Sequence, residues 1–490
     1  MNKFYITTTL PYVNADPHIG FALELVQADV IARYHRYLLG EDVVFNNGTD
    51  EHGIKIYRKA IEAGKEPQDY VDEYAERFKK LVEALNISTT NFIRTTDKKH
   101  KEAAQEFWKR CLEKGDIYKA KYKIKYCVGC ELEKTDSELE DGRCPVHPNL
   151  AIEDIEEENY FFKFSKFQKP LLEYYEKNPD FVLPDYRFNE IKRFVEEGLR
   201  DFSVSRIKEK MSWGIAIPGD DSQVMFVWFD ALINYISTLG WPNDTRFSEF
   251  WPGVQIAGKD NLRQQSAIWQ AMLLSAGLLP SKQILIHGFV TADGQKMSKS
   301  LGNVIDPFVI AEKYSVDVLR YYLLREIPTG EDGDFSEKKL VDRYNGDLAN
   351  GLGNLISRVA TLIDNNLDGE LIYKKVEGRK WKVENYDKWI EDFRLHDALG
   401  EVWKLIAEAN QYIDERKPWV EVKENPDKFL ETMTVIVGMI HNIIWYLQPF
   451  MPETAQKIAK VFGDDLTNKE IPENYKFLVK KGESLFPRIK

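Results

Sequence analysis

The chain has 490 residues, of which 43% are hydrophobic and 30% charged, a composition that suits about three globular domains. The net charge of -12 excludes a protein with general affinity for nucleic acid, so any RNA partner must meet a local basic patch. No run of 18 apolar residues exists, and Met1 leads into a strand-like segment without the apolar region of a signal peptide. We therefore expect a cytoplasmic protein with no membrane partner.

The first elements along the chain are a strand, a turn and a helix. Phe4–Thr9 is rich in β-branched and aromatic residues, and from His18 to Leu39 apolar residues recur with a helical period. His18-Ile19-Gly20 therefore marks a helix N-terminus that follows a strand, a place that favours anions and, in an open parallel sheet, ligands.

A second strand, Asp42–Asn46, leads into Gly48-Thr49-Asp50-Glu51-His52-Gly53. Carboxylates and a histidine at the end of a strand suggest substrate contact. An isolated motif of this kind is more often a polar turn.

Helical patterns follow at residues 67–85 and 98–114, and then the cysteines cluster. Cys127-x-x-Cys130 and Cys144-x-x-His147 have the spacing of a tetrahedral Cys3His zinc site. Such clustering in a cytosolic chain indicates a metal site and not disulfides. Because all four ligands come from the protein, we expect one structural zinc ion.

A second α/β run begins at Val224–Asp230 and includes strands Val254–Ala257 and Gln283–His287. Gly253 to Lys259 superficially fits a phosphate loop, but Asp260 stands where Ser or Thr is needed and the intervening residues read as a strand.

The loop after these strands, Asp293–Ser300, alternates two lysines with small hydroxyl residues. Lysine ammonium groups on flexible stems suit a departing polyphosphate, although many such runs are solvated surface turns.

From Leu340 on we expect no strands. Residues 348–362, 393–413 and 428–450 carry amphipathic helical patterns, which predict a helical bundle. The expected architecture is therefore α/β: a doubly wound parallel sheet with an inserted zinc-bearing subdomain, followed by an all-α bundle.

Several motifs together carry a family resemblance. Pro11-Tyr12 to His18-Ile19-Gly20 and Lys296-Met297-Ser298-Lys299-Ser300 resemble the two signatures of class I aminoacyl-tRNA synthetases. The Gly48–Gly53 segment, Trp228-Phe229-Asp230-Ala231 and the Cys3His knuckle narrow the resemblance to the methionyl-tRNA synthetase family, from about residue 3 to 455. It implies that methionine and ATP, with Mg2+, give methionyl-adenylate and pyrophosphate, and that methionine then passes to the 3′ end of tRNA(Met).

The resemblance also implies an order of domains. They are the first half of a Rossmann-type catalytic domain (1–115), an inserted connective subdomain with the zinc knuckle (116–222), the second catalytic half (223–290), the lysine loop and stem-contact connection (291–345), and a helical anticodon-binding domain (346–490). Because the chain stops at Lys490, soon after the bundle, we expect a monomer without an appended β-barrel.

Individual roles follow from positions that match the family motifs. The expected catalytic residues are His18, beside the α-phosphate, Lys299, which tracks the leaving pyrophosphate, and Lys296, a supporting positive charge. The expected ATP-binding residues are His18, Gly20, Phe21, Glu24, Gly258, Asp260 and Lys299. The expected methionine-binding residues are Leu10, Tyr12, Asp50, Arg206, Trp228, Tyr235 and Gln265. The expected anticodon-binding residues are Asn354, Arg358 and Trp419. On pattern alone, Trp228, Tyr235 and Trp419 would be packing residues.

Two residues depart from the family pattern. Phe21 stands where the first signature has its second histidine, and Gln265 stands where the family has a histidine lining the methionine pocket. Phenylalanine cannot donate a hydrogen bond to phosphate. Gln265 therefore keeps open an enzyme for another amino acid, and Phe21 keeps open an inactive paralogue that only binds tRNA.

Overall fold

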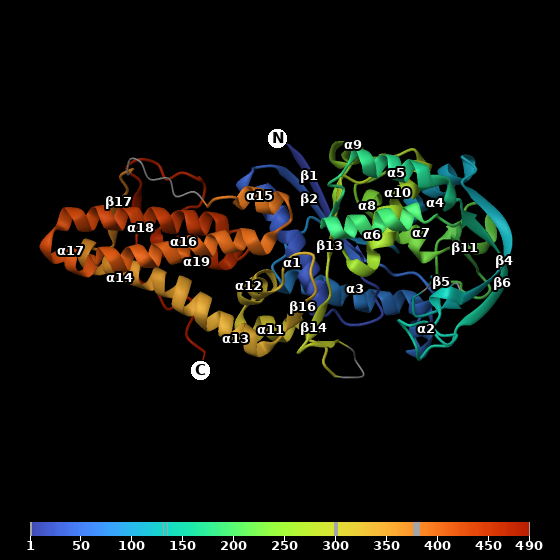
Figure 1. Cartoon of the computed structure of the whole chain (residues 1–490), viewed down its shortest axis with the longest axis horizontal. Coiled ribbons are helices and arrows are strands. Elements are labelled where there is room, and N and C mark those ends of the chain that lie inside the picture. Colours follow the sequence, from blue (N-terminus) through green and yellow to red (C-terminus); the bar gives the residue numbers. More distant parts are fainter. Residues whose placement is uncertain (1, 131, 135, 298–301, 376–382, 490) are drawn as a thin grey trace.

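A six-stranded parallel sheet lies at the centre of the molecule, in the order β3-β2-β1-β12-β13-β7 (Figure 1). Its strands are β1 (Lys3–Thr8), β2 (Asp42–Thr49), β3 (Asn91–Arg94), β12 (Val254–Gly258), β13 (Gln283–His287) and β7 (Val182–Leu183). The computed structural model describes residues 2–130, 132–134, 136–297, 302–375 and 383–489. The doubly wound parallel sheet predicted from the sequence is confirmed, and since β12 fills 254–258, a phosphate loop there is excluded.

The order of the strands reverses between β1 and β12. β1 pairs with β2 on one side, Lys3 opposite Asp42, and with β12 on the other, Ile6 opposite Val254. Alternate residues of β1 face opposite sides of the sheet, so that Phe4 and Ile6 belong to one core and Tyr5 to another. The crevice at the carboxyl ends of these strands is the place where open α/β sheets bind ligands.

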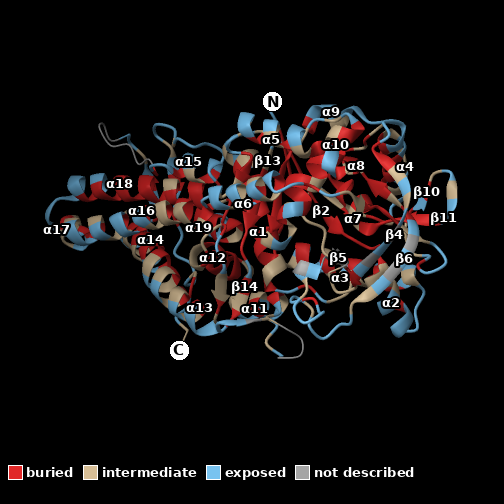
Figure 2. Ribbon diagram, turned by 45° about the vertical axis from the view of Figure 1, so that its right-hand side comes forward, coloured by how far each residue is buried: buried red, intermediate tan, exposed pale blue. Residues whose placement is uncertain are grey.

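Helices cover both faces of the sheet (Figure 2). In the first half of the chain they are α1 (Ile19–Arg33), extended by a π-helical turn (Tyr34–Leu38), α2 (Ile54–Glu62), α3 (Pro67–Ala84) and α4 (Lys98–Glu113). In the second half they are α7 (Val227–Leu232), α8 (Asn234–Ser237), α9 (Thr245–Phe250), a π-helical turn (Gln264–Ile268) and α10 (Trp269–Ala276). The core around α1 lies on one face, and the core around α4 and α10 on the other.

A long β-hairpin dominates the inserted block. Its strands β4 (Ile117–Cys127) and β6 (Glu153–Phe162) place Lys121, Lys123 and Lys125 opposite Glu158, Glu156 and Asp154. Opposite charges across antiparallel strands stabilise such a ribbon. The remaining elements of the block are β5 (Leu132–Lys134), α5 (Gln168–Lys177), α6 (Asp185–Glu196), β8 (Phe202–Ser203), β9 (Ser205–Ile207), β10 (Ala216–Ile217) and β11 (Asp220–Met225).

The block is tied into its surroundings at two points. β7, from within residues 116–222, pairs with β13 at the edge of the main sheet. β11, where the second α/β run begins, pairs with β9 and β10 in a small separate sheet. The second half therefore adds strands to the main sheet only from Val254 onward.

A connecting region joins the sheet to the bundle. It contains β14 (Val290–Ala292), β15 (Gln295–Lys296), α11 (Pro307–Tyr314), α12 (Val316–Glu326), β16 (Gly333–Phe335) and α13 (Glu337–Arg343). The bundle contains a π-helical segment (Tyr344–Gly353), α14 (Asn354–Leu367), α15 (Tyr386–Glu391), α16 (Leu395–Arg416), α17 (Pro418–Glu424), α18 (Pro426–Leu447) and α19 (Pro452–Phe462).

The prediction that no strand follows Leu340 is wrong. β17 (Glu370–Ile372) and β18 (Lys476–Leu478) form a two-stranded antiparallel pair beside the bundle (Figure 1). Strands of three residues are too short to show a period of two, so only their pairing reveals them.

The bundle is joined to the sheet by a shared hydrophobic core. A single hydrophobic core runs from one face of the sheet through α1 and α12 into α16 and α18. Within the described residues, α18 is the one helix long and apolar enough to cross a membrane, but 83% of its most apolar window is buried in the protein. α18 is therefore a core helix of the bundle.

Candidate functional site

The turn that precedes α1 is built around His18. This residue is the N-cap of α1, and its Nδ1 accepts a hydrogen bond of 3.1 Å from the Gly20 backbone N–H. The side chain is exposed, yet it lies in a crowded crevice, and desolvation lowers its pKa. A neutral ring that accepts at Nδ1 carries its hydrogen on Nε2, which can donate to a phosphate oxygen. A side chain at Gly20 would lie 3.0 Å from the His18 ring, so glycine fits this turn.

The lysine loop meets this turn. The Ile19 backbone N–H donates to the Ile305 carbonyl at 3.1 Å, and Ile305 lies just beyond the loop. On the other side of the loop, β15 pairs with β14, with Lys296 opposite Thr291, and Met297 packs against the core around α1. Lys299, with Ser298 to Leu301, lies outside the described residues. The segment just after the loop is thus fixed at the N-terminus of α1, and the segment before it is held by β14.

Glu24 links three segments at the carboxyl ends of the central strands. Its Oε1 accepts from the Thr9 backbone N–H at 2.7 Å and from the Thr9 hydroxyl at 2.6 Å, and its Oε2 lies 2.8 Å from His287 Nε2. Burial alone would lower the pKa of His287, but the hydrogen bond and charge of Glu24 outweigh it and raise the pKa. The sequence analysis treated His287 only as the last residue of a strand. Its position at the end of β13, just before the lysine loop, could have indicated a role in the site.

The other nucleotide candidates lie at the ends of neighbouring elements. Gly258 ends β12, and a side chain there would come within 2.8 Å of Asp260 Oδ1. Burial raises the pKa of Asp260. Phe21 lies edge-on to Phe78 of α3, with ring centroids 5.4 Å apart and an interplanar angle of 83°. Its ring therefore packs against α3.

The structure brings several methionine-pocket candidates together. Tyr12 and Asp50 form an isolated parallel bridge, so the loops after β1 and β2 lie side by side. Gln265 Nε2 donates to the Tyr235 hydroxyl at 2.7 Å, and these two side chains are 3% and 2% exposed. Leu10 and Trp228 are half-buried.

Two of these residues have features that bear on ligand binding. The buried Trp228 Nε1 has no acceptor among the described residues. Tyr235 is fixed from behind, because the Tyr5 hydroxyl donates to its carbonyl at 2.7 Å. The backbone at Tyr235 is therefore tied to β1.

A buried polar layer supports the Gly48–Gly53 segment. His52 Nδ1 lies 3.1 Å from the Asp230 carboxylate, and the Glu51 carboxylate binds Arg94 at 2.6 and 2.9 Å. Burial raises the pKa of Asp230. The sequence suggests that this segment contacts substrate, and the resemblance places Asp50 in the methionine pocket. The structure shows that the Glu51 and His52 side chains are buried in the protein interior, which no local pattern predicts.

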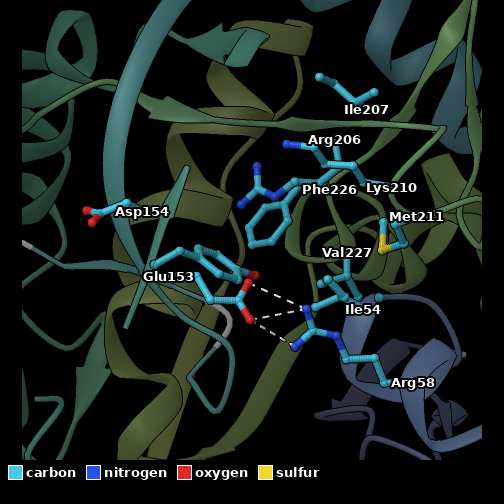
Figure 3. A pocket seen from close by; sticks show the side chains of 12 residues that line it. Ile54, Arg58, Glu153, Asp154, Arg206, Ile207, Lys210, Met211, Phe226 and Val227 are labelled. Carbon is cyan, nitrogen blue, oxygen red and sulfur yellow. Dashed lines mark hydrogen bonds and ion pairs between the residues drawn. The ribbon is translucent and has the colours of Figure 1, made fainter. Parts of the chain in front are cut away.

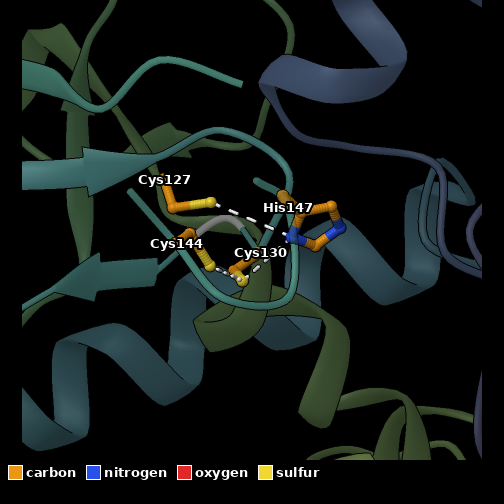
Figure 4. Close-up of side chains that lie close together, drawn as sticks. All are labelled: Cys127, Cys130, Cys144 and His147. Carbon is orange, nitrogen blue, oxygen red and sulfur yellow. Dashed lines mark hydrogen bonds between the residues drawn. The ribbon is translucent and has the colours of Figure 1, made fainter. Parts of the chain in front are cut away.

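The four knuckle ligands converge (Figure 4). The ligand atoms of Cys127, Cys130, Cys144 and His147 all lie within 4.8 Å of one another, and Cys130 Sγ is 3.4 Å from Cys144 Sγ and 3.2 Å from His147 Nδ1. A tetrahedral site with zinc–sulfur bonds of about 2.3 Å needs ligands at roughly such separations. The cysteines are free, so the donor set fits a structural metal such as zinc.

The bundle carries the anticodon candidates on one surface. Asn354 and Arg358 lie one turn apart on α14, and the Arg358 guanidinium lies 5.7 Å from the Trp419 ring. Trp419 is 43% exposed, whereas a packing residue would be covered. Arg358 also pairs with Asp414 at 2.6 Å.

Arg206 lies apart from the sheet, on β9 of the inserted block. Its guanidinium donates to Ser203 Oγ at 2.9 Å and to the Ser205 carbonyl at 2.7 Å. It lines a cavity of about 360 Å3 between the inserted block and the segment that follows His52 (Figure 3).

Comparisons with known proteins cover nearly the whole chain. Residues 4–154 and 135–360 match the family described as tRNA synthetases class I (M), and residues 369–483 match the anticodon binding domain of methionyl tRNA ligase. A methionine–tRNA ligase of Thermotoga maritima is 42% identical, over 99% of this chain and 80% of the relative. One of Brucella suis is 41% identical, over 94% and 92%. Among solved structures, Mycobacterium tuberculosis methionyl-tRNA synthetase in complex with methionyl-adenylate matches with a TM-score of 0.94, at 36% identity and with both chains fully covered.

Proposed function

Since this chain belongs to the methionyl-tRNA synthetase family of class I, with the activity of a methionine–tRNA ligase, we propose that it activates methionine with ATP and esterifies tRNA(Met). The observation that carries the proposal is the 3.1 Å hydrogen bond from Ile19 N–H to the Ile305 carbonyl. It supports one shared ATP site, because it holds the histidine turn and the lysine loop at the same crevice of the sheet.

In the first step a methionine carboxylate oxygen attacks the α-phosphorus of ATP, and pyrophosphate leaves. His18 donates from Nε2 to an α-phosphate oxygen, and the free N–H groups at the start of α1 add positive potential. Lys296 and Lys299 stabilise the charge that develops on the pyrophosphate. Mg2+ accompanies ATP as its counter-ion.

The rest of the nucleotide is held at the ends of β1, β12 and β13. Gly20 and Gly258 let the nucleotide approach the backbone closely. Asp260 faces the ribose, and Glu24 contributes through its bonds to Thr9 and His287. Phe21 is a wall residue, which its packing on Phe78 supports.

Methionine lies beside this crevice, with its ammonium near Asp50 and its carboxylate near Arg206. Leu10, Tyr12, Trp228 and Tyr235 surround the side chain, and aromatic ring edges suit a thioether. Gln265, which donates to the Tyr235 hydroxyl, fixes that ring and takes the place of a histidine in this role.

We also propose one resident zinc ion, held by Cys127, Cys130, Cys144 and His147. Zinc at such a site crosslinks the knuckle and stabilises its fold.

The protein works as a monomer in the cytoplasm, where unpaired cysteines stay reduced. Asn354, Arg358 and Trp419 read the unpaired anticodon bases, since an exposed aromatic beside an arginine is a common way to stack and bind RNA bases.

The test is exchange of labelled pyrophosphate into ATP, measured with each amino acid, followed by aminoacylation of tRNA(Met). Methionine alone should support exchange, and Lys299→Ala should abolish it, while the exposed Lys338→Ala on α13 should leave it unchanged. Exchange with another amino acid would assign a different substrate, and no exchange would indicate an inactive paralogue. Metal analysis should find one zinc per chain.

A further inference from the structure

A chain of buried polar side chains leads to Tyr235 and has no part in the function described above. Gln255 on β12, Gln270 on α10 and Ser281 just before β13 are 1%, 0% and 0% exposed. Side chains two residues apart on a strand face the same side of the sheet, so Gln255 lies on the side of Ala257, in the core around α4 and α10. Burying such polar groups costs free energy unless they are hydrogen-bonded. Their hydrogen bonds therefore show how this part of the core is held.

Two backbone groups fix the orientation of the Gln270 amide. The Ser281 backbone N–H donates to Gln270 Oε1 at 2.9 Å, and Gln270 Nε2 donates to the Gln265 carbonyl at 2.7 Å. A backbone N–H only donates and a carbonyl only accepts, so a rotated amide would lose both bonds. Gln270 Nε2 also donates to the Ser281 hydroxyl oxygen at 3.2 Å. That oxygen is an acceptor toward Gln270, and its own hydrogen is left for another partner.

The same direction of donation continues from Ser281 to Tyr235. The Ser281 hydroxyl donates to Gln255 Oε1 at 2.6 Å. The other end of this amide, Gln255 Nε2, therefore faces Gln265 and donates to its Oε1 at 3.3 Å. Gln265 Nε2 in turn donates to the Tyr235 hydroxyl oxygen at 2.7 Å. Tyr235 is thus an acceptor toward Gln265, and its one hydrogen points elsewhere.

The direction of this hydrogen matters because Tyr235 lines the methionine pocket in the proposed function. Burial raises the pKa of the Tyr235 hydroxyl, so the group stays protonated. A thioether sulfur is a weak hydrogen-bond acceptor, whereas a CH2 group in its place accepts nothing. If the Gln265 amide were rotated, its Oε1 would accept the tyrosine hydrogen, and the pocket would lose its donor.

We propose that Gln255, with Ser281 and Gln270 behind it, is a specificity-determining positioning residue. These side chains hold the Gln265 amide in one orientation, which leaves the Tyr235 hydrogen for the thioether of methionine. A site that hydrogen-bonds its substrate discriminates against an isostere that lacks the bonding group. The pocket therefore prefers methionine to norleucine, which has a CH2 group in place of sulfur. The inference rests on the proposed function, which places Tyr235 beside the methionine side chain.

The test measures selectivity and not activity alone. Gln255→Met has a similar volume and removes both amide groups. In pyrophosphate exchange, its kcat/KM for methionine relative to norleucine should fall about threefold to tenfold, as expected for one neutral hydrogen bond. The loss should lie in KM for methionine, with kcat within about twofold of the parent. Ser281→Ala, which removes the donor to Gln255, should shift selectivity in the same direction.

The matched control is Gln283→Met at the start of β13. The Gln283 amide donates to the Asp180 carbonyl at 2.8 Å and lies on the neighbouring strand. The same substitution there leaves the hydrogen bonds between Ser281 and Tyr235 in place. Gln283→Met should therefore keep the parental preference for methionine over norleucine.

A double-mutant cycle separates orientation from packing. Tyr235→Phe removes the hydroxyl and should lower the preference for methionine by about the same factor, and Gln255→Met should then lower it no further. A parental preference in Gln255→Met, whether or not its activity falls, would overturn the inference. A full additional loss of preference in the Tyr235→Phe background would also overturn it. If Gln255→Met does not fold, the same criteria apply to Ser281→Ala. Absence of exchange with methionine in the parent would instead refute the proposed function.

Discussion

Arg320 of α12 is a buried connection between the N-terminal helix and the bundle. Its side chain is 0% exposed, and its Nη2 lies 2.8 Å from the Asp29 carboxylate of α1, which is also 0% exposed. It further donates to the carbonyls of Phe450 at 2.9 Å, Pro449 at 2.9 Å and Leu85 at 3.3 Å. We predict that Arg320→Met strongly destabilises the protein.

The magnitude follows from burial. Burial alone would raise the pKa of Asp29, but the charges of Arg320 and Arg33 and the hydrogen bonds of Ser88 outweigh it and lower the pKa. In Arg320→Met, Asp29 keeps Arg33 at 2.7 Å, yet it loses one of its two cations, and three buried carbonyls lose their donor. Breaking a buried pair by removing one partner costs about 3–5 kcal/mol, against about 0–1 kcal/mol for an exposed pair.

The assay is urea unfolding at saturating zinc, with hydrogen exchange to localise the effect. Arg320→Met should lose about 3–5 kcal/mol and exchange faster in α1 and around residues 449–451. In a double-mutant cycle with Asp29→Asn, the combined loss should fall short of the sum by about 0.5–3 kcal/mol. Lys338→Met, whose side chain is 84% exposed, is the control and should match the parent. A loss below about 1 kcal/mol for Arg320→Met, or strict additivity, would refute the reasoning.

Three further predictions concern single side chains. Because the Phe21 ring packs against Phe78, Phe21→His should change pyrophosphate exchange only modestly. Burial lowers the pKa of His100 to about 3, so that between pH 6.5 and 3 this residue is protonated in the unfolded chain but not in the folded protein. The free energy of unfolding should therefore fall by about 1.4 kcal/mol for each unit by which the pH decreases. His100→Asn should lack this slope. Trp419→Ala should lower aminoacylation about tenfold through lost base stacking and leave exchange unchanged.

Each of these has an outcome that contradicts it. A hundredfold gain in exchange for Phe21→His would show that a second histidine is missing from the chemistry. Parallel pH profiles for the parent and His100→Asn, in urea unfolding between pH 6.5 and 5, would show that His100 titrates normally. Unchanged aminoacylation in Trp419→Ala would show that Trp419 does not bind the anticodon. The control is Leu478→Ala, which changes another exposed apolar residue in the same half of the chain.

Local patterns in the sequence predicted a large part of the fold. The alternation from strand to helix around His18, and the short apolar runs at 254–257 and 283–287, predicted parallel strands that the sheet contains. The Cys3His spacing predicted a cluster that the structure brings together. These features are properties of neighbouring residues, so they can be recognised before the chain is folded.

The tertiary structure alone decided which distant groups meet. Nothing in the local sequence pairs Ile19 with Ile305, Glu24 with His287, or Arg320 with Asp29, yet these contacts join the signatures, build the crevice and connect the domains. The three-residue strands β17 and β18 are recognisable only by their pairing. The physical reason is that such contacts are stabilised by burial in a shared core, and which residues share a core depends on the path of the whole chain and not on its local periodicity.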